Sequence, residues 1–333
     1  MPDASPHDWP HVQLHVVTGK GGTGKSTIAA ALALGLAARG KTVLLCEVEG
    51  RQGIAQLFDV APLPYEERRI ARGPGGRAGD VYALAIDPES ALLEYLSMYY
   101  RLGRAGKALD RFGVIEFATT IAPGVRDVLL TGKVYEAANR NSRNKGARSY
   151  DAIVLDAPPT GRIAQFLNVN DELAGLAKMG PIKSQADTVT KLLRSRRTAI
   201  HLVTVLEEMP VQETADGVAE LRRAGLPVGG IIVNMVRPQD LDEGARRQLF
   251  DGKVDAKLIA KELSVAGIDS AGLVDTLLDE GLHHAERRAL EDSQRSLVAD
   301  IGVPTYELPQ LTGGIDLSAL YELSAELCDQ GLA

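Results

Sequence analysis

The chain of 333 residues is poor in cysteine, in aromatic residues and in basic charge. Its two cysteines, Cys46 and Cys328, are far apart and form no CxxC pair, so neither a disulfide framework nor a zinc site of paired cysteines is expected. Aromatic residues make up only 5% of the chain. The formal net charge of -7 disfavours nucleic acid as a partner, because nonspecific binding depends on lysine and arginine displacing counterions from phosphates.

Long apolar runs are also missing. No segment reaches the roughly 18 apolar residues of a membrane span, and the proline- and acid-containing residues 1–13 lack the basic start and apolar core of a signal peptide. The hydrophobic fraction of 45% and the charged fraction of 24% are ordinary for soluble globular proteins. We therefore expect a cytoplasmic protein that is peripheral at the membrane at most.

What the chain does contain is an alternation of short apolar runs with helical patterns. The apolar runs read as strands, and they are LHVVTG from residue 14, KTVLLCEVE, VYALAID, YDAIVLDA, AIHLVTVL and GGIIVNMV. Continuous runs of this kind are typical of parallel strands covered on both faces. The fold class predicted is α/β, with a mostly parallel sheet, helices on both faces, and ligands beyond the carboxyl ends of the strands.

We expect one domain over residues 1–333, with helical inserts at about 88–148 and 171–197 that form a lobe beside the sheet. Residues 61–79 mix proline, glycine and arginine without periodicity, so they are predicted to be a surface loop.

The strongest motif is the stretch from Gly19 to Ser26, which fits G-x-x-x-x-G-K-S/T between a predicted strand and a predicted helix. Glycine lets backbone N–H groups converge on phosphate oxygens, and the start of the helix adds its positive dipole end. Lys25 is expected to reach the terminal phosphates, and the Ser26 hydroxyl to bind Mg²⁺. The motif therefore predicts ATP with Mg²⁺ as the ligands, and the residues expected to bind the nucleotide are Gly21, Gly22, Thr23, Gly24, Lys25, Ser26 and Thr27.

A rival interpretation remains for the same loop. Its glycines also satisfy G-x-G-x-x-G, and Glu47 and Glu49 follow at the end of the next strand, where a dinucleotide-binding fold places its ribose acid. Lys25 and Ser26 favour the triphosphate, because a dinucleotide turn has no need of a lysine aimed at a terminal phosphate.

The segment TGKGGTGKST resembles the deviant Walker A P-loop ATPases, a class that includes MinD, ParA, the nitrogenase iron protein and the arsenite-pump ATPase ArsA. The mark of that class is Lys20. The resemblance implies that Lys20 reaches across a dimer interface to the phosphates of the partner, as an arginine finger does. The expected partner is a second copy of the chain or a similar ATPase.

A second segment narrows the resemblance to the family of ArsA and the tail-anchored-protein-targeting ATPases. Residues 156–161, DAPPTG, are similar to the D-T-A-P-T-G-H segment of that family, and IDPESALLEYL, PGVRD, P-x-x-E-T and VNM support the match along nearly the whole chain. Asp156 closes an apolar strand, where a carboxylate can hold a magnesium-bound water. The resemblance further implies that Asn234 reads the adenine and that Pro309 lies in a loop lining the base.

The chain departs from this family at several positions. Glu49 stands where the family has its water-activating aspartate, and its longer side chain predicts slow hydrolysis because a misplacement of about 1 Å can cost on the order of a hundredfold in rate. Arg162 replaces the family histidine. The cysteines that bind zinc or arsenite in the family are missing, so no zinc is expected, and five methionines are too few for a methionine-rich client groove. The pair His283-His284 reads as solvated surface.

The function predicted is an ATP hydrolase that acts as a dimeric switch, coupling ATP binding and hydrolysis to an unknown protein or membrane partner. The alternatives are the catalytic subunit of an anion or metalloid pump, and a weakly hydrolysing subunit that regulates a more active one. A module that positions DNA or membranes is disfavoured, because the C-terminal helix pattern is acidic, whereas a membrane-surface helix needs a basic face.

Overall fold

The computed structural model describes residues 9–76, 78–100, 124–140, 148–176, 181–270 and 272–333. Over these residues the chain forms an eight-stranded sheet with the strand order β3-β4-β2-β5-β1-β6-β7-β8. The strands are β1 (Leu14–Gly19), β2 (Val43–Glu47), β3 (Arg68–Arg72), β4 (Asp80–Ala85), β5 (Ala152–Asp156), β6 (Thr198–Thr204), β7 (Val228–Val236) and β8 (Thr305–Pro309). All neighbouring strands pair in parallel except β3, which is antiparallel to β4.

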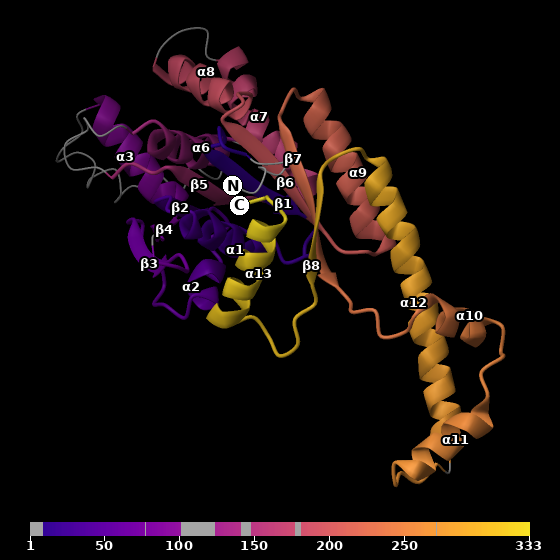
Figure 1. Ribbon diagram of the computed structural model, residues 1–333. Coiled ribbons are helices and arrows are strands. Elements are labelled where there is room, and N and C mark those ends of the chain that lie inside the picture. Colours follow the sequence, from indigo (N-terminus) through magenta and orange to yellow (C-terminus); the bar gives the residue numbers. More distant parts are fainter. Residues whose placement is uncertain (1–8, 77, 101–123, 141–147, 177–180, 271) are drawn as a thin grey trace.

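Helices cover both faces of this sheet (Figure 1). One face carries α1 (Lys25–Ala38), α2 (Gly53–Leu57) and α13 (Leu317–Asp329). The other face carries α6 (Val125–Ala138), α7 (Thr160–Leu176), α8 (Pro181–Leu193) and α9 (Glu208–Arg223), and α3 (Pro88–Tyr100) packs against α6. Each face has its own cluster of buried apolar side chains, so the α/β class with helices on both faces is confirmed.

The alanine-rich sequence of α1 follows from its position between the sheet and α13. Every residue from Ile28 to Ala37 is buried, because one side of the helix packs on the strands and the other on α13. A helix covered on all sides has no polar stripe. Gly35 lies at the contact with α13, where a Cβ would lie 3.2 Å from Cys328 Sγ and 3.4 Å from Ser324 O of that helix, so the small residue allows the close approach of the two helices.

The expectation of a surface loop over residues 61–79 was wrong for part of that stretch. Arg68–Arg72 forms the edge strand β3, paired with β4 across a register shift between Arg69 and Ala71. The strand is mostly exposed and rich in arginine, so it lacks the apolar alternation by which strands are recognised. Charged residues on an edge strand also protect it from pairing with another chain.

The two helical inserts are described only in part. Helices α3 and α6 fall in the first insert, and α8 with the end of α7 falls in the second, while residues 101–123, 141–147 and 177–180 lie outside the described residues. The division of the whole chain into a single domain stays a prediction.

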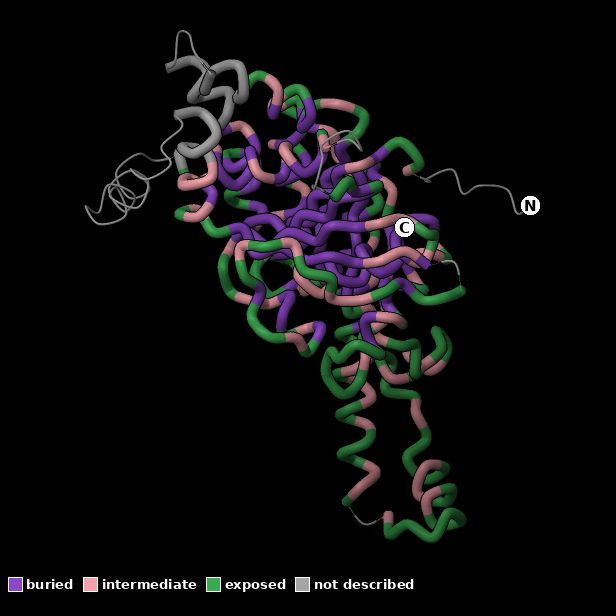
Figure 2. The backbone as a smooth tube through the Cα atoms, turned by 90° about the vertical axis from the view of Figure 1, so that its left-hand side faces the viewer, coloured by how far each residue is buried: buried purple, intermediate pink, exposed green. Residues whose placement is uncertain are grey.

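An arm of three helices projects away from the sheet (Figures 1 and 2). It consists of α10 (Glu243–Phe250), α11 (Ala256–Val265) and the first half of α12 (Leu273–Asp300), whose 28 residues give a length of about 42 Å. The shorter two helices bury no residue. Ion pairs attach the inner half of α12 to the sheet, since the buried Glu291 contacts Arg288 at 2.6 Å and also Arg237, just beyond β7.

Candidate functional site

The predicted phosphate loop lies between β1 and α1, in the strand-turn-helix context that its motif requires. Gly24 precedes the helix with φ of +89°, a left-handed conformation that suits glycine. A Cβ at this position would also lie 2.5 Å from Asn234 Nδ2. The loop is closed internally, because Thr23 Oγ1 donates to Lys20 O at 2.9 Å and Lys25 Nζ donates to the same oxygen at 3.4 Å.

Two of the predicted metal-binding groups are already together. Ser26 Oγ, in the first turn of α1, donates a hydrogen bond of 2.6 Å to Asp156 Oδ2 at the end of β5. The parallel pairing of β5 with β1 places Asp156 beside Val17, two residues before the loop. A hydroxyl and a carboxylate at this separation are oxygen ligands of the kind that Mg²⁺ prefers, so this pair fits the ion that the motif predicts.

Asp156 is 8% exposed, and its environment favours the protonated form. The pKa of its carboxyl is raised to about 6: burial is the main cause, the hydrogen bond from Ser26 and the charge of Lys25 oppose it, and the nearby Glu47 and Glu49 add to it. The ionised form of Asp156 is therefore unfavourable in this environment, and a bound cation would stabilise it, because a positive charge nearby favours the ionised form.

The two acids after β2 have different roles. Glu47 is buried, and its carboxylate accepts hydrogen bonds from the N–H groups of Gly53 at 3.2 Å and Ile54 at 3.3 Å at the start of α2. Its oxygens therefore satisfy a helix N-terminus, which counts against the ribose acid of a dinucleotide site. Glu49 lies farther along the loop, partly exposed, 3.9 Å from the Arg51 guanidinium.

The residues expected to contact the base lie at the ends of neighbouring strands. Asn234 is in β7 and is 5% exposed, and Pro309 ends β8, which pairs with β7 through Val236. The Asn234 amide Nδ2 donates to Thr23 O at 2.9 Å, so it connects β7 to the phosphate loop. The next residue, Met235, has φ of +58°, a conformation that is uncommon for residues other than glycine.

Lys20 has a partner that the motif analysis did not assign. Its Nζ lies 2.7 Å from Glu213 Oε1 in α9, and both side chains are about one-third exposed. Glu213 belongs to the P-x-x-E-T segment, which matches the family but for which the sequence predicts no role. Lys20 and Glu213 are too far apart in the sequence for this contact to be predicted. They meet because β6 lies next to β1 in the sheet, and α9 follows β6 in the chain.

The remaining predicted nucleotide-binding residues of the loop differ in exposure. Gly21 and Gly22 are exposed at the turn, Thr23 is buried, and Thr27 follows Ser26 within α1. The predicted site residues thus lie in the loop and first turn after β1 and at or just beyond the carboxyl ends of β2, β5, β7 and β8.

Comparison with known proteins gives the family. A family model described as anion-transporting ATPase matches residues 12–196, which include the phosphate loop and Asp156. The chain belongs to the anion-transporting ATPase family. Membership confirms the resemblance drawn from the sequence and implies nucleotide binding.

Relatives of this family differ in how much of the chain they share. ATPase BagA of Mycobacterium tuberculosis is 54% identical over 97% of this chain and 96% of its own length. An arsenical pump-driving ATPase of Acidiphilium multivorum is 28% identical over 67% of this chain, which is 39% of that relative. ATPase GET3 of Kluyveromyces lactis is 25% identical over 68% of this chain and 73% of its own length. In the part of the chain that the structure describes, no helix has the length and hydropathy needed to span a bilayer.

Proposed function

We propose that this family member is a Mg²⁺-dependent ATP hydrolase that works as a dimeric switch for a protein or membrane partner. The observation that carries the proposal is the hydrogen bond of 2.6 Å between Ser26 and Asp156, next to the phosphate loop. It supports a site in which the loop binds the β- and γ-phosphates while the hydroxyl and the carboxylate hold the cation. Bound Mg²⁺ would neutralise charge that develops on the phosphates.

Within one chain, Lys25 supplies positive charge to the terminal phosphates from the first turn of α1. Asn234 positions the loop through its bond to Thr23 O and has its Oδ1 without a hydrogen-bond partner among the described residues, so this oxygen is open to a base amine. Pro309 pairs with Val236, two residues beyond Asn234, and is proposed to line the same base.

Lys20 supports the dimeric part of the proposal. Its side chain is about one-third exposed, and its amino group pairs with Glu213 of α9, outside the loop. In the proposed dimer it leaves Glu213 and offsets charge on the phosphates held by the partner. A group supplied in this way contributes about 10³ to 10⁵ to the rate in P-loop enzymes.

Glu49 is proposed to orient the attacking water, and hydrolysis is proposed to be slow because its carboxylate has one more methylene than the aspartate of the family. The Glu49→Gln variant keeps the shape and removes the charge. We expect its single-turnover rate to fall by at least about a hundredfold, the usual contribution of a positioned base. An unchanged rate would refute this role for Glu49.

A thiol-dependent metalloid pump is not favoured by the cysteines. Cys46 lies buried in β2, where burial raises the pKa of its thiol to about 12, and Cys328 lies in α13. A thiolate is the form that binds soft metals, so the Cys46 thiol is poorly suited to that task. A weakly hydrolysing regulatory subunit remains the second candidate, and Glu49 in place of aspartate is the observation that favours it.

A complementation assay tests the dimer directly. Lys20→Ala and Lys25→Ala chains are each expected to lack turnover, whereas an equal mixture should regain about one quarter of the wild-type rate, because half of randomly formed twofold dimers are mixed and each has one complete site. No recovery in the mixture would contradict the trans role of Lys20.

If the wild-type chain alone shows no turnover, the role of Lys20 is tested in a heterodimer instead. An Asp156→Asn variant purified from native cells with ATP should then retain a similar ATPase, and the mixing assay is repeated with that subunit. Retention of no second ATPase would contradict the heterodimer.

A further inference from the structure

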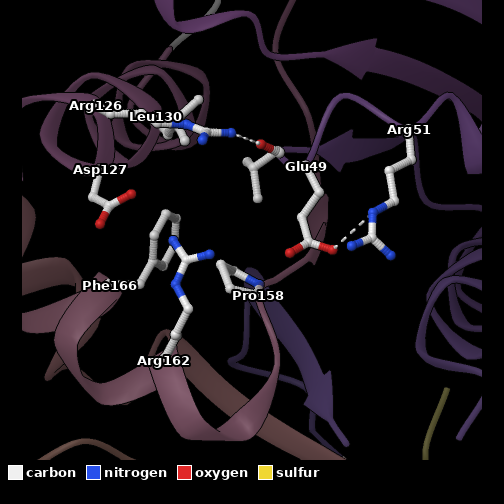
Figure 3. A pocket seen from close by; sticks show the side chains of 9 residues that line it. Glu49, Arg51, Arg126, Asp127, Leu130, Pro158, Arg162 and Phe166 are labelled. Atoms are coloured by element: carbon white, nitrogen blue, oxygen red, sulfur yellow. Dashed lines mark hydrogen bonds and ion pairs between the residues drawn. The ribbon is translucent and has the colours of Figure 1, made fainter. Parts of the chain in front are cut away.

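A cavity of about 200 Å³ lies beside the nucleotide site, on the face of the sheet that carries α6 and α7 (Figure 3). Its walls come from four segments: the loop after β2, the start of α6, the turn after β5 and the start of α7. The nine lining residues are Val48, Glu49, Arg51, Arg126, Asp127, Leu130, Pro158, Arg162 and Phe166.

Two arginines face this cavity from opposite walls. Figure 3 shows the Arg162 guanidinium, from α7, pointing into the space between Phe166 and Pro158, while Arg126 enters from α6. Arg126 Nη2 donates only a long bond of 3.4 Å to Val48 O, and the guanidinium of Arg162 makes no hydrogen bond or ion pair with the described residues. Guanidinium groups with unused donors are suited to bidentate recognition of carboxylate or phosphate.

The other charges of the cavity do not cancel these two. Glu49 lies nearer to Arg51, at 3.9 Å, and the carboxyl of Asp127 has no ion pair within 4.0 Å among the described residues. Burial raises the pKa of Asp127, an effect that Arg162 and then Arg126 oppose. The cavity also lies at the first turns of α6 and α7, where helix dipoles favour a negative charge.

Part of the cavity lining is apolar. Phe166, Leu130 and Val48 are all 2% exposed or less, so a ligand that reaches them is shielded from water on one side. A volume of this size holds roughly seven water molecules, at about 30 Å³ each, or an organic molecule of similar bulk.

From this arrangement we propose that the cavity is a binding site for a small organic anion, with its carboxylate or phosphate group between Arg162 and Arg126 and its apolar part on Phe166 and Leu130. Arg162 thereby acquires a role that the sequence left open. The binding itself does not depend on the proposed ATPase function.

The site also has a regulatory consequence, which rests on the proposed function. The cavity is lined by Glu49, the proposed water-orienting residue, and by Pro158, two residues beyond Asp156. An anion bound there contacts both segments that respond to nucleotide. By linkage, if ATP changes the affinity for the anion by some factor, the anion changes the affinity for ATP by the same factor.

Calorimetry with benzoate and phenyl phosphate tests the site, with benzamide as a neutral molecule of the same shape. The protein is saturated with Mg-ADP, so that the phosphate loop is not the binding site, and the ionic strength is matched with chloride. We expect benzoate or phenyl phosphate to bind and benzamide not to bind. The anion that binds more tightly indicates whether the natural head group is a carboxylate or a phosphate.

Variants assign the binding to the cavity. Arg162→Ala and Arg126→Ala should each lower the affinity for the anion by at least about tenfold, as expected for the loss of a charge-assisted hydrogen bond. Arg162→Lys should recover only part of the affinity because lysine lacks the planar fork. Arg247→Ala, which removes an exposed arginine in α10 of the arm, is the matched control and should bind as the wild type does.

Equal binding of benzoate and benzamide, no binding of either anion at millimolar concentration, or unchanged affinity in Arg162→Ala would each overturn the proposal. Repeating the titration in a Lys25→Ala background without nucleotide separates the two proposals. If the anion still binds to this variant and the wild type does not bind ADP, the proposed ATPase function is contradicted and the proposed anion site is supported.

Discussion

The amino group of Lys20 lies 2.7 Å from the carboxylate of Glu213, so the residue expected to act on a partner is held by its own chain. Both side chains are partly exposed, and such an ion pair contributes about 0.2–1 kcal/mol. The contact is weak enough for the phosphates of a bound partner to replace it.

The first prediction follows from that pair. Glu213→Gln frees Lys20 without removing it, so ATP-dependent dimerisation measured by sedimentation should become up to about thirtyfold tighter, the equivalent of at most about 1 kcal/mol for each of the two Lys20 side chains in the dimer. Glu220→Gln, farther along α9, is the control. Weaker dimerisation in Glu213→Gln would instead mean that the glutamate itself takes part in the interface.

The second prediction concerns the loop backbone. Gly24→Ala combines a left-handed conformation with a Cβ that would lie 2.5 Å from Asn234 Nδ2, so thermal unfolding without nucleotide should show a loss of about 1–3 kcal/mol. Gly21→Ala is the matched control, because nothing lies within 4 Å of its Cβ and its φ is not in the left-handed region. Equal stability of the two variants would contradict the geometry described for the loop.

The third prediction separates stability from metal binding at Asp156. Burial raises the pKa of this carboxyl to about 6, so the ionised form is the costly one in the folded protein. Asp156→Asn keeps an acceptor for Ser26 and removes the charge, and it should raise the stability of the nucleotide-free protein by about 1–3 kcal/mol at pH 7.5. The same variant should lose the dependence of ATP binding on Mg²⁺.

Chemical denaturation checks the first half of this prediction, and nucleotide titrations with and without Mg²⁺ check the second. Ser26→Ala is the companion variant, since it removes the other proposed ligand. A variant at position 156 that is less stable and still depends on Mg²⁺ would show that the carboxylate has a structural role only.

The fourth prediction concerns two buried histidines in the sheet. The N–H of Gly230 donates to His201 Nδ1 at 3.1 Å, which leaves the proton of His201 on Nε2, 3.1 Å from His15 Nδ1. Burial lowers the pKa of His201 to about 4, and burial, followed by the charge of His201, lowers that of His15 well below its usual value. Both rings are therefore neutral in the folded protein.

The sign of the pH dependence follows from these shifts. Unfolded histidine takes up a proton below about pH 6.5, whereas folded His201 does not until near pH 4, so its stabilising contribution is complete above pH 6.5 and is lost as the pH falls toward 4. The lowered pKa of His15 acts in the same direction. Between pH 7.5 and 5 the loss from His201 alone is about 2 kcal/mol. Urea unfolding at both pH values measures it.

The pH slope of the variants, rather than their absolute stability, is the decisive quantity. His201→Gln should reduce the slope by the contribution of one ring, and His283→Gln, at an exposed position of α12, should leave it unchanged. Equal slopes in all three proteins would mean that the buried pair takes up protons in the folded state.

The sequence predicted those parts of the site that are local in the chain. The phosphate loop and Asp156 follow from short motifs at the ends of apolar strands, and parallel pairing brings those ends together. The edge strand β3 was missed because its arginines mask any apolar alternation. The contact of Lys20 with Glu213 and the facing pair Arg126 and Arg162 depend on how distant helices pack, which no local pattern encodes.

The arm was also beyond sequence reasoning. Its helices α10 and α11 bury no residue, so the burial pattern that marks a packed helix is missing. What fixes the arm is the ion-pair cluster around Glu291 and Arg288 at its base, and the partners of such a cluster are not recognisable from spacing alone.

Calorimetric titration of ATP into the wild-type chain and into Lys25→Ala, each with Mg²⁺, tests most directly whether the loop is an ATP site. We expect saturable binding by the wild type and an affinity at least about tenfold lower in the variant, because a charge-assisted contact to the terminal phosphates is lost. Absence of binding by the folded wild-type chain, or equal binding by both proteins, would contradict the assignment of residues 19–27 as the nucleotide site.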